Sequence, residues 1–301
     1  MAASTCAPAL FIKRGLRRAL LSNSSGAVWH FLQSTSSIKR NISSTTCQYL
    51  NSVNKMTNYE VGKKAAAIKA VDNHIKSGDL VGIGSGSTIV YAVDRLAELV
   101  ANGTLINIQC VPTSFQAKQL ILENKLTLTS LESSPRLAVA IDGADESDSD
   151  LTLIKGGGGC LAQEKVVAAN ADLFVVIADD RKQSEELGTS WKYVPIEVLE
   201  LAYKPLQATI ETKFGGKVNL RMAKAKAGPV VTDNGNLILD WSFQIAELRE
   251  KIGISPDKDL WQAVNTQLCC LAGVVDTGLF VNMARVAYFG DAEGNVKEHI
   301  K

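Results

Sequence analysis

The sequence predicts an α/β protein with a Rossmann-like, open and mostly parallel sheet, followed by a second, smaller α+β domain of ferredoxin-like type. Short β-like runs alternate with helical segments up to about residue 192, which is the pattern of βαβ units. From residue 193 the order becomes irregular and includes a hairpin signal. We therefore expect a main, catalytic α/β domain of residues 56–192 plus 280–301 and a smaller domain of residues 193–279.

The first domain begins with an expected helix over residues 58–76, because apolar residues recur there at helical spacing. Asn102-Gly103 ends a second helix by left-handed capping chemistry. The remaining elements follow from short apolar runs and the helical stretches between them. In order, we expect a strand at 80–84, a helix over 89–100, a strand at 105–111, a helix at 115–123, a strand at 126–128, strands at 137–141 and 151–154, a helix at 161–170 and a strand at 173–178.

The second domain is expected to contain a hairpin over residues 228–240, because Asn234-Gly235 is a strong turn signal. Around it we expect a strand at 194–199, a helix at 203–213, a strand at 217–222, a helix at 259–268 and a strand at 274–281. Residues 286–289 and 296–300 form a last hairpin in this prediction.

The composition is that of a globular protein large enough for one large or two ordinary domains. The chain has 301 residues, of which 46% are hydrophobic and 21% charged, with a net charge of +1. No apolar run approaches the roughly 18 residues that span a bilayer, and no basic cluster marks the predicted domains. We therefore expect neither a membrane nor a nucleic acid as partner.

The cysteines and histidines exclude several kinds of site. Six cysteines occur without CxxC spacing, which is typical of a reduced intracellular protein rather than a disulfide scaffold. The three histidines all lie outside the glycine-rich and charged motifs described below. A histidine-ligated zinc site, a Ser-His-Asp triad and a Cys-His pair are therefore not expected.

Residues 1–55 differ from the rest, with seven Lys or Arg and no Asp or Glu. The basic amphipathic stretch around residues 11–21 resembles a mitochondrial transit peptide. The alternatives are a disordered leader or an extended start, with Met56 as the true first residue. We exclude this segment from the fold and expect a cytoplasmic protein, with mitochondrial targeting by residues 1–55 as the other reading.

Four expected strands end in glycines or charged residues, and ligands bind just beyond the carboxyl ends of strands in open parallel sheets. The four ends are Gly84-Ser85-Gly86-Ser87-Thr88, Asp142-Gly143-Ala144-Asp145-Glu146, Lys155-Gly156-Gly157-Gly158-Gly159 and Asp179-Asp180-Arg181-Lys182. Carboxylates, lysines and phosphate-sized loops together predict one site for a small, anionic, hydroxyl-rich molecule.

The loop 84–88 joins a strand to a helix, so its backbone N–H groups and hydroxyls fit a phosphate monoester. The alternative is a turn that serves packing alone. The loop lacks the Gly-Lys-[Ser/Thr] of a P-loop, and no acidic ribose ligand stands at the end of the next strand, so we discount dinucleotide binding.

The carboxylates and lysines of these motifs each allow two interpretations. Asp142 and Asp145 suit either a divalent cation, although not at EF-hand spacing, or sugar hydroxyls and proton transfer. Lys155 and the glycines after it suit an anion cradle or a flexible loop. Glu164 is either a base or an ordinary helix residue, and the pattern alone favours the second. Lys182 is either a phosphate partner or a surface lysine.

Six motifs then occur in a fixed order. They are Gly-Ile-Gly-Ser-Gly-Ser-Thr, Pro-Thr-Ser-Phe-Gln-Ala, Ile-Asp-Gly-Ala-Asp-Glu, Leu-Ile-Lys-Gly-Gly-Gly-Gly-Cys-Leu-Ala-Gln-Glu-Lys, Val-Val-Thr-Asp-Asn-Gly-Asn and Gly-Val-Val-Asp-Thr-Gly-Leu-Phe. On these motifs, residues 57–295 closely resemble ribose-5-phosphate isomerase of type A in its eukaryotic form.

The resemblance implies interconversion of ribose 5-phosphate and ribulose 5-phosphate through an enediolate, in the non-oxidative branch of the pentose phosphate pathway. It implies no metal, no cofactor and a homodimer or homotetramer. Glu164 would carry the proton between C2 and C1, while Lys155 and the amides of Gly156, Gly157 and Gly158 would stabilise the enediolate oxygen.

The same resemblance implies the substrate contacts. Asp142 and Asp145 would bond the hydroxyls, and Asp142 would assist ring opening or the O1/O2 proton transfer. The binding residues it implies are Ser85, Gly86, Ser87, Thr88, Gly143 and Ala144, with Lys182 and Lys64 adding positive charge near the phosphate.

Three other functions are alternatives. An amino-sugar-phosphate isomerase/deaminase is expected to use a histidine in ring opening, and none is placed for that role. A non-catalytic sugar-phosphate sensor needs neither a base nor an oxyanion partner, whereas Glu164 and Lys155 are both present. An NAD-dependent oxidoreductase would need the dinucleotide site that was discounted above.

Overall fold

The computed structural model describes residues 44–253 and 259–301, with side chains from residue 59 onward. Residues 57–301 form one compact unit, and residues 1–56 belong to another. The first described element is helix α3 (Ser44–His74), which begins well before the predicted start at residue 58. Most of the predicted leader, residues 1–43, lies outside the described residues. No helix of the described part is long and apolar enough to span a membrane.

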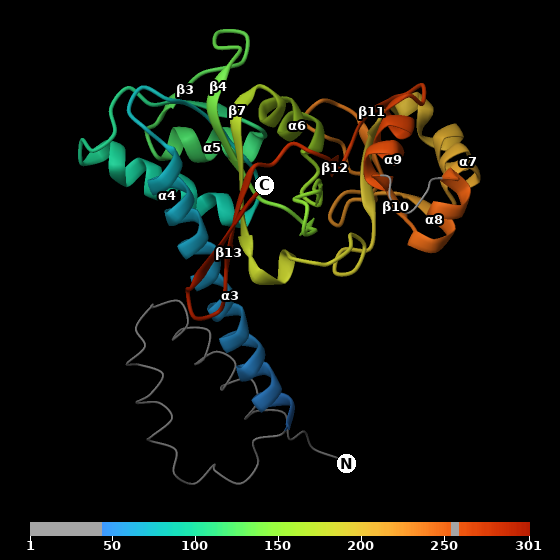
Figure 1. Cartoon of the computed structure of the whole chain (residues 1–301), viewed down its shortest axis with the longest axis horizontal. Helices are drawn as coiled ribbons and strands as arrows, with labels where there is room; N and C mark the ends of the chain where they lie inside the picture. The colour runs from blue at the N-terminus through green and yellow to red at the C-terminus, as the bar shows by residue number, and fades with distance from the viewer. Residues whose placement is uncertain (1–43, 254–258) are drawn as a thin grey trace, which may run out of the picture. The chain divides into compact units, whose positions relative to one another are not determined.

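The main sheet has seven strands in the order β14-β13-β7-β4-β1-β2-β3. All neighbouring strands pair in parallel except β13 and β14, which are antiparallel. The predicted mostly parallel α/β sheet is therefore confirmed (Figure 1). Its strands are β1 (Leu80–Ile83), β2 (Gln109–Pro112), β3 (Thr127–Leu128), β4 (Leu137–Asp142), β7 (Ala171–Asp179), β13 (Val286–Gly290) and β14 (Val296–Ile300).

Both faces of this sheet are covered, which explains why its central strands are continuous apolar runs. Side chains such as Val139 and Val175 pack with α3, α4 (Ser87–Ala101) and α5 (Phe115–Glu123). On the other face, Ala140 and Val176 belong to a core that includes Val167 of helix α6 (Leu161–Ala169). Because side chains alternate along a strand, each strand contributes to both cores.

One predicted strand of the parallel sheet was placed wrongly. Of residues 151–154, only β6 (Leu153–Ile154) is extended, and it pairs antiparallel with β5 (Glu146–Ser147) and β12 (Leu279–Phe280) in a separate three-stranded sheet. Leu151 has a positive φ of 54°, which interrupts the run. Leu153 of β6 is buried against the main sheet, and Ile154 is buried in the core of the small sheet.

Gly278 divides the strand predicted over 274–281. Its N–H donates to the carbonyl of Pro195, and its own carbonyl accepts the N–H of Lys155 at 2.8 Å. A Cβ at this position would overlap the carbonyl of Lys155, so the close approach requires glycine. The residues before it form β11 (Val274–Thr277), and those after it form β12 in a different sheet.

The small domain contains an antiparallel sheet in the order β11-β8-β10-β9, formed with β8 (Val194–Val198), β9 (Lys217–Leu220) and β10 (Leu237–Ser242). Helices α7 (Tyr203–Phe214) and α9 (Leu260–Cys269) confirm two predicted helices, whereas α8 (Ile245–Ile252) was not predicted. The first arm of the predicted hairpin makes only isolated bridges at Pro229 and Val231.

Candidate active site

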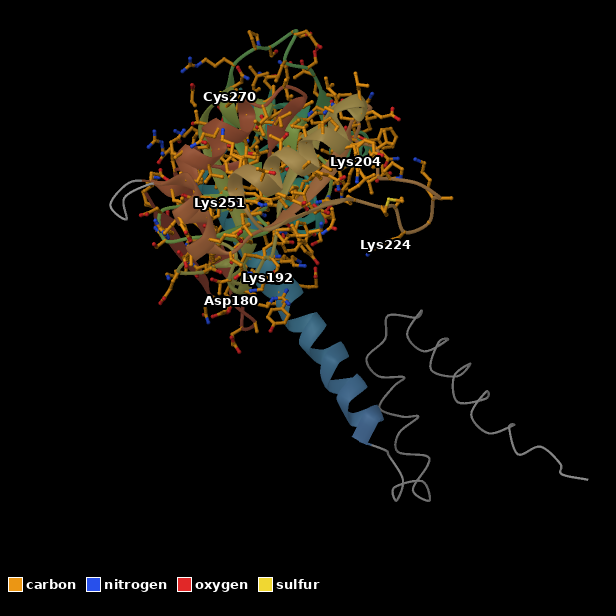
Figure 2. All side chains as sticks on the ribbon, turned by 90° about the vertical axis from the view of Figure 1, so that its right-hand side faces the viewer. Asp180, Lys192, Lys204, Lys224, Lys251 and Cys270 are labelled. Atoms are coloured by element: carbon orange, nitrogen blue, oxygen red, sulfur yellow. The ribbon has the colours of Figure 1, made fainter. Side chains whose placement is uncertain are left out.

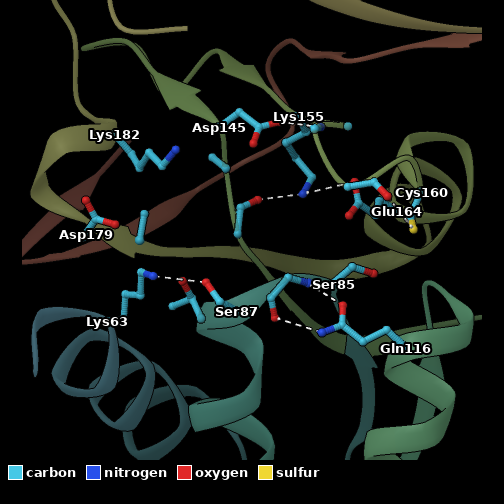
Figure 3. Close-up of a pocket in the computed structure, with 18 of the residues that line it drawn as sticks. Lys63, Ser85, Ser87, Gln116, Asp145, Lys155, Cys160, Glu164, Asp179 and Lys182 are labelled. Carbon is cyan, nitrogen blue, oxygen red and sulfur yellow. Dashed lines mark hydrogen bonds and ion pairs between the residues drawn. The ribbon is translucent and has the colours of Figure 1, made fainter. Parts of the chain in front are cut away.

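The order of strands along the main sheet reverses at β1, because β2 lies on one side of it and β4 on the other. Ligands of open α/β sheets bind at such a switch point. A cavity of about 300 Å³ opens there (Figure 3). Its lining residues are Lys63, Ser85, Gly86, Ser87, Thr88, Gln116, Gly143, Ala144, Asp145, Lys155, Gly156, Gly157, Gly158, Cys160, Glu164, Ala178, Asp179, Arg181 and Lys182.

Lys155 lies at the centre of the charged groups, with only 3% of its side chain exposed. Its Nζ lies 2.9 Å from Oδ2 of Asp142 and 3.3 Å from Oε2 of Glu164, and it donates a 2.6 Å hydrogen bond to the carbonyl of Gly143. Burial lowers the pKa of Lys155, but the two carboxylates outweigh burial and leave that pKa above its usual value. The ammonium is therefore charged at every physiological pH.

Glu164 stands in the first turn of α6 and is 5% exposed. Burial and the charge of Asp142 raise the pKa of Glu164 to about 8, against the opposing effect of Lys155. Apart from the ion pair with Lys155 at 3.3 Å, its Oε2 has no polar partner among the described residues. A buried carboxyl at the wall of a cavity, with a pKa near neutrality, is able to accept a proton from carbon and return it.

Helix α6 is held to the small sheet on both sides of this carboxyl. Gln163 donates a 2.7 Å hydrogen bond to Oδ1 of Asn234, in the turn before β10. Nζ of Lys165 donates to Oδ1 of Asp276 at 2.5 Å and to the carbonyl of Thr277 at 2.6 Å, both in β11. These contacts attach α6 to the small sheet through the two residues that flank Glu164 in sequence.

Asp142 lies behind Lys155 and does not line the cavity. Its Oδ1 accepts hydrogen bonds from the N–H of Ser85 at 3.0 Å and of Gly143 at 2.7 Å. A Cβ on Gly84 would overlap this carboxylate, so glycine is required where β1 passes it. Asp142 therefore reaches the cavity in this structure through its ion pair with Lys155, and its predicted contact with substrate hydroxyls stays a prediction.

Asp145 does face the cavity, and its Oδ2 accepts the N–H of Gly157 at 2.6 Å. Burial raises the pKa of Asp145, while the Gly157 N–H and the charge of Lys155 oppose the rise. In the same loop, neither Gly156 nor Gly158 donates its N–H to a partner among the residues that the structure describes. These two amides are available to an oxygen atom of a ligand.

The other end of the cavity is positively charged. Lys63 donates a 3.1 Å hydrogen bond to Oγ of Ser87, at the start of α4. Lys182 lies with its Nζ 5.1 Å from the ring centroid of Trp191, and Arg181 forms an ion pair with Asp179 at 2.6 Å. Two lysines, an arginine and a helix N-terminus are the groups that bind phosphate in proteins.

The loop after β1 is fixed by the loop after β2. Oγ of Ser85 donates to Oγ of Ser114 at 2.6 Å and lies 2.9 Å from Oγ1 of Thr113. The N–H of Gly86 donates to Oε1 of Gln116 at 2.9 Å. The hydroxyl of Ser85 is therefore engaged within the protein, whereas its neighbours Ser87 and Thr88 stand at the start of α4.

All the site residues predicted from the sequence line this cavity except Asp142 and Lys64. Lys64 is exposed on α3, and Lys63 takes its place because successive helical residues point about 100° apart. The structure also adds Gln116, Cys160, Ala178, Asp179 and Arg181. All of them except Ala178 lie within motifs quoted from the sequence, so inspection of whole motifs would have found them.

Two further observations limit the chemistry. Burial raises the pKa of Cys160 to about 12, so its thiol is protonated at neutral pH. Within residues 44–253 and 259–301, no group of three or more His, Cys, Asp or Glu side chains is arranged to hold a metal ion.

The family model of ribose 5-phosphate isomerase A (phosphoriboisomerase A) matches residues 109–294. The chain is 54% identical to ribose-5-phosphate isomerase of Sus scrofa over 80% of its own length and 75% of that protein. It is 53% identical to the Homo sapiens enzyme, over 84% of this chain and 79% of the relative.

Solved structures give the same result. A D-ribose-5-phosphate isomerase in complex with phospho-erythronic acid superimposes with a TM-score of 0.73 and 37% identity, covering 81% of this chain and 99% of that one. Ribose 5-phosphate isomerase from Plasmodium falciparum superimposes with a TM-score of 0.71 and 34% identity, over 79% and 97% of the two chains.

Proposed function

The chain belongs to the ribose 5-phosphate isomerase A family, and we propose that the cavity at the β1/β4 switch point is where it acts. Its reaction is the interconversion of D-ribose 5-phosphate and D-ribulose 5-phosphate, a step of the non-oxidative pentose phosphate pathway. One observation carries the assignment of the site: the buried carboxyl of Glu164 lies 3.3 Å from the ammonium of Lys155 inside a cavity with a cationic far end.

In the proposed mechanism, the phosphate occupies the end formed by Ser87, Thr88, Lys63 and Lys182, which leaves C1 and C2 near Glu164. Glu164 removes the proton from C2 of the open-chain aldose. The C2–H electron pair becomes the C1–C2 double bond, and the carbonyl pair moves onto O1. Transfer of a proton from the Glu164 carboxyl to C1, with O1 protonated and O2 deprotonated, gives the ketose.

The negative charge on the oxygen of the intermediate is stabilised by the ammonium of Lys155 and by the unpartnered amides of Gly156 and Gly158. Fixed donors in a buried site act strongly because they need no reorganisation during the reaction. Asp145 faces the cavity and contacts the substrate hydroxyls. In this proposal Asp142 holds Lys155 and does not itself exchange a proton with the sugar.

The full chain is tested with ribose 5-phosphate in D₂O, with the products followed by NMR. We expect ribulose 5-phosphate with deuterium at C1, because an enzyme carboxyl that carries the proton exchanges it with solvent. Ketose formed without deuterium, at the same rate in the wild type and in Glu164→Gln, would argue for direct transfer between the carbons and against Glu164 as carrier. Binding without turnover would favour the sugar-phosphate sensor.

We also propose the assembly and location that the family resemblance and the leader suggest. A homodimer or homotetramer is tested by analytical ultracentrifugation of the full chain. The small domain of residues 193–279 remains a prediction of boundaries, tested by limited proteolysis. A cytoplasmic location, or a mitochondrial one directed by residues 1–55, is tested by imaging fluorescent fusions with and without that segment.

Lys182→Met is expected to raise KM about tenfold with little change in kcat, because one charge-assisted hydrogen bond to phosphate is worth about 1.5 kcal/mol. The matched control is Lys204→Met, since Lys204 is exposed on α7 and labelled on the surface in Figure 2. Steady-state kinetics give KM and kcat for both variants. A KM unchanged in Lys182→Met would remove this lysine from the phosphate site.

The pH dependence follows from the raised pKa of Glu164. Only the ionised carboxylate can accept the C2 proton, so kcat/KM should rise with pH and level off above about 8. The measurement is kcat/KM across the range from neutral to mildly alkaline pH. A flat profile would assign the proton transfer to a group with a lower pKa.

A further inference from the structure

Arg221 connects the small sheet to the glycine loop of the active site. It directly follows strand β9, and its side chain is 13% exposed. Its Nη1 donates to the carbonyl of Gly156 at 2.9 Å and to the carbonyl of Gly157 at 3.2 Å. Arg221 itself does not line the cavity.

The guanidinium is held in place from the other side by Asp240 of β10. Nε donates to Oδ2 of Asp240 at 2.9 Å, and Nη2 donates to Oδ1 at 2.5 Å. This two-point pairing fixes the plane of the guanidinium, because both its donors and the two carboxylate oxygens lie in rigid planar groups. The ring centroid of Tyr193 lies 5.8 Å from Cζ of Arg221.

Holding a carbonyl also fixes the N–H of the next residue. A trans peptide group is planar, and its C=O and N–H point in opposite directions. With the Gly156 carbonyl bound to Arg221, the N–H of Gly157 points the other way and donates to Asp145. With the Gly157 carbonyl bound to Arg221, the N–H of Gly158 is turned away from Arg221, on a residue that lines the cavity.

The glycine loop needs such an external restraint. Glycines have the largest backbone freedom of any residue, so four in succession do not hold an amide in one direction by themselves. Gly156 adopts a φ of 96°, and a Cβ on Gly157 would collide with Asp145 and Trp191. Close packing thus requires glycine here. The hydrogen bonds from Arg221 fix the backbone conformation that glycine by itself would leave free.

We propose that Arg221, oriented by Asp240, is a positioning residue that directs the amide of Gly158 toward the charge formed on the substrate oxygen during isomerisation. The proposal rests on the proposed function of the glycine loop. It makes the small sheet a determinant of the rate of the chemical step rather than of substrate affinity.

The test compares Arg221→Met, Asp240→Asn and their double variant, with Lys217→Met as the matched control. Lys217 lies in the same strand β9 and forms an exposed ion pair with Glu211 at 3.0 Å, away from the cavity. We expect Arg221→Met to lower kcat about 10- to 100-fold, somewhat less than the loss of an oxyanion donor itself. KM should change less than about threefold, as for an interaction made only in the transition state.

Asp240→Asn should show a smaller fall in kcat, and the double variant should be no slower than Arg221→Met, because Asp240 acts only through Arg221. In Arg221→Ala, added guanidinium should restore part of kcat, which a purely structural role would not allow. Lys217→Met should keep wild-type kinetics, and circular dichroism verifies that each variant is folded.

Three results would overturn the proposal: a raised KM with kcat unchanged, additive effects of the two substitutions, or the same fall in kcat in Lys217→Met. A folded Arg221→Ala that guanidinium does not rescue also counts against it. If the proposed role of Glu164 is wrong, a Glu164 variant will turn over normally. That result does not depend on the kinetics of the Arg221 variants, so the two proposals fail separately.

Discussion

Glu164→Gln is expected to lower kcat by at least about 100-fold, the usual effect of removing a general base. The amide has the same shape as the carboxyl but cannot accept the C2 proton. Lys155 keeps its ion pair with Asp142 at 2.9 Å and its hydrogen bond to Gly143, so the cavity should stay intact. KM should therefore change little, and deuterium incorporation from D₂O should fall together with kcat.

The control for this variant is Glu200→Gln, which removes the same charge from an exposed residue outside the cavity. Stopped-time assays with ribose 5-phosphate and with ribulose 5-phosphate measure the two directions of the reaction. The substitution must lower kcat/KM by the same factor in both directions, because the equilibrium constant does not depend on the enzyme. Turnover by Glu164→Gln within about threefold of the wild type would show that another group carries the proton, since removal of a base costs far more.

Lys155→Met should have the second large effect, on stability as well as on rate. Two buried carboxyls, Asp142 and Glu164, would lose the cation that lies between them. Removing one partner of a buried ion pair typically costs about 3–5 kcal/mol. The enediolate would also lose its nearest positive charge, so we expect kcat to fall at least about 100-fold.

The loss of stability in Lys155→Met should depend on pH. Without the ammonium, burial and mutual repulsion raise the pKa of Glu164 further above its value of about 8 in the intact chain. A carboxyl whose pKa is raised by folding stabilises the fold below its unfolded pKa, and that contribution is lost as pH rises through the folded pKa. The variant should therefore lose more stability at pH 9 than at about pH 5.

Urea unfolding at both pH values measures this difference. Lys165→Met is the matched control, because Lys165 is also a largely buried lysine of the same region, paired with Asp276 rather than with Glu164. It should destabilise the fold with much less dependence on pH, even if the loss of this anchor of α6 also lowers kcat. Equal pH dependence in the two variants would contradict the role of Lys155 as the partner of both carboxyls.

The sequence predicted the main sheet well because β1, β4 and β7 are apolar runs with polar ends, a pattern that depends on neighbouring residues alone. It failed where distant contacts decide the structure. Residues 151–154 resemble a sheet strand locally, but Leu151 with its positive φ and the pairing with β12 place β6 elsewhere. Helix α8 was missed because its eight residues bury little more than Leu248.

The same limit applies to the site. Glu164 looks like an ordinary helix residue in sequence, because its raised pKa results from burial in the folded chain and from the charge of Asp142, which belongs to another segment. The choice of Lys63 over Lys64 depends on which face of α3 meets the loop after β1. Arg221 and Asp240 lie outside all six motifs quoted from the sequence, so only the folded chain reveals their contact with the glycine loop.

The attachment of α6 to the small sheet separates affinity from rate along the chain. Every group at the cationic end of the cavity comes from residues 63–182, whereas Gln163 and Lys165, which flank the proposed base Glu164, are anchored to Asn234 and Asp276. Residues 63–182 can thus hold the phosphate, while residues of the small sheet affect the reactivity of the site without contacting the ligand. Changes in residues 217–277 would then alter turnover speed without altering which phosphorylated sugar is held.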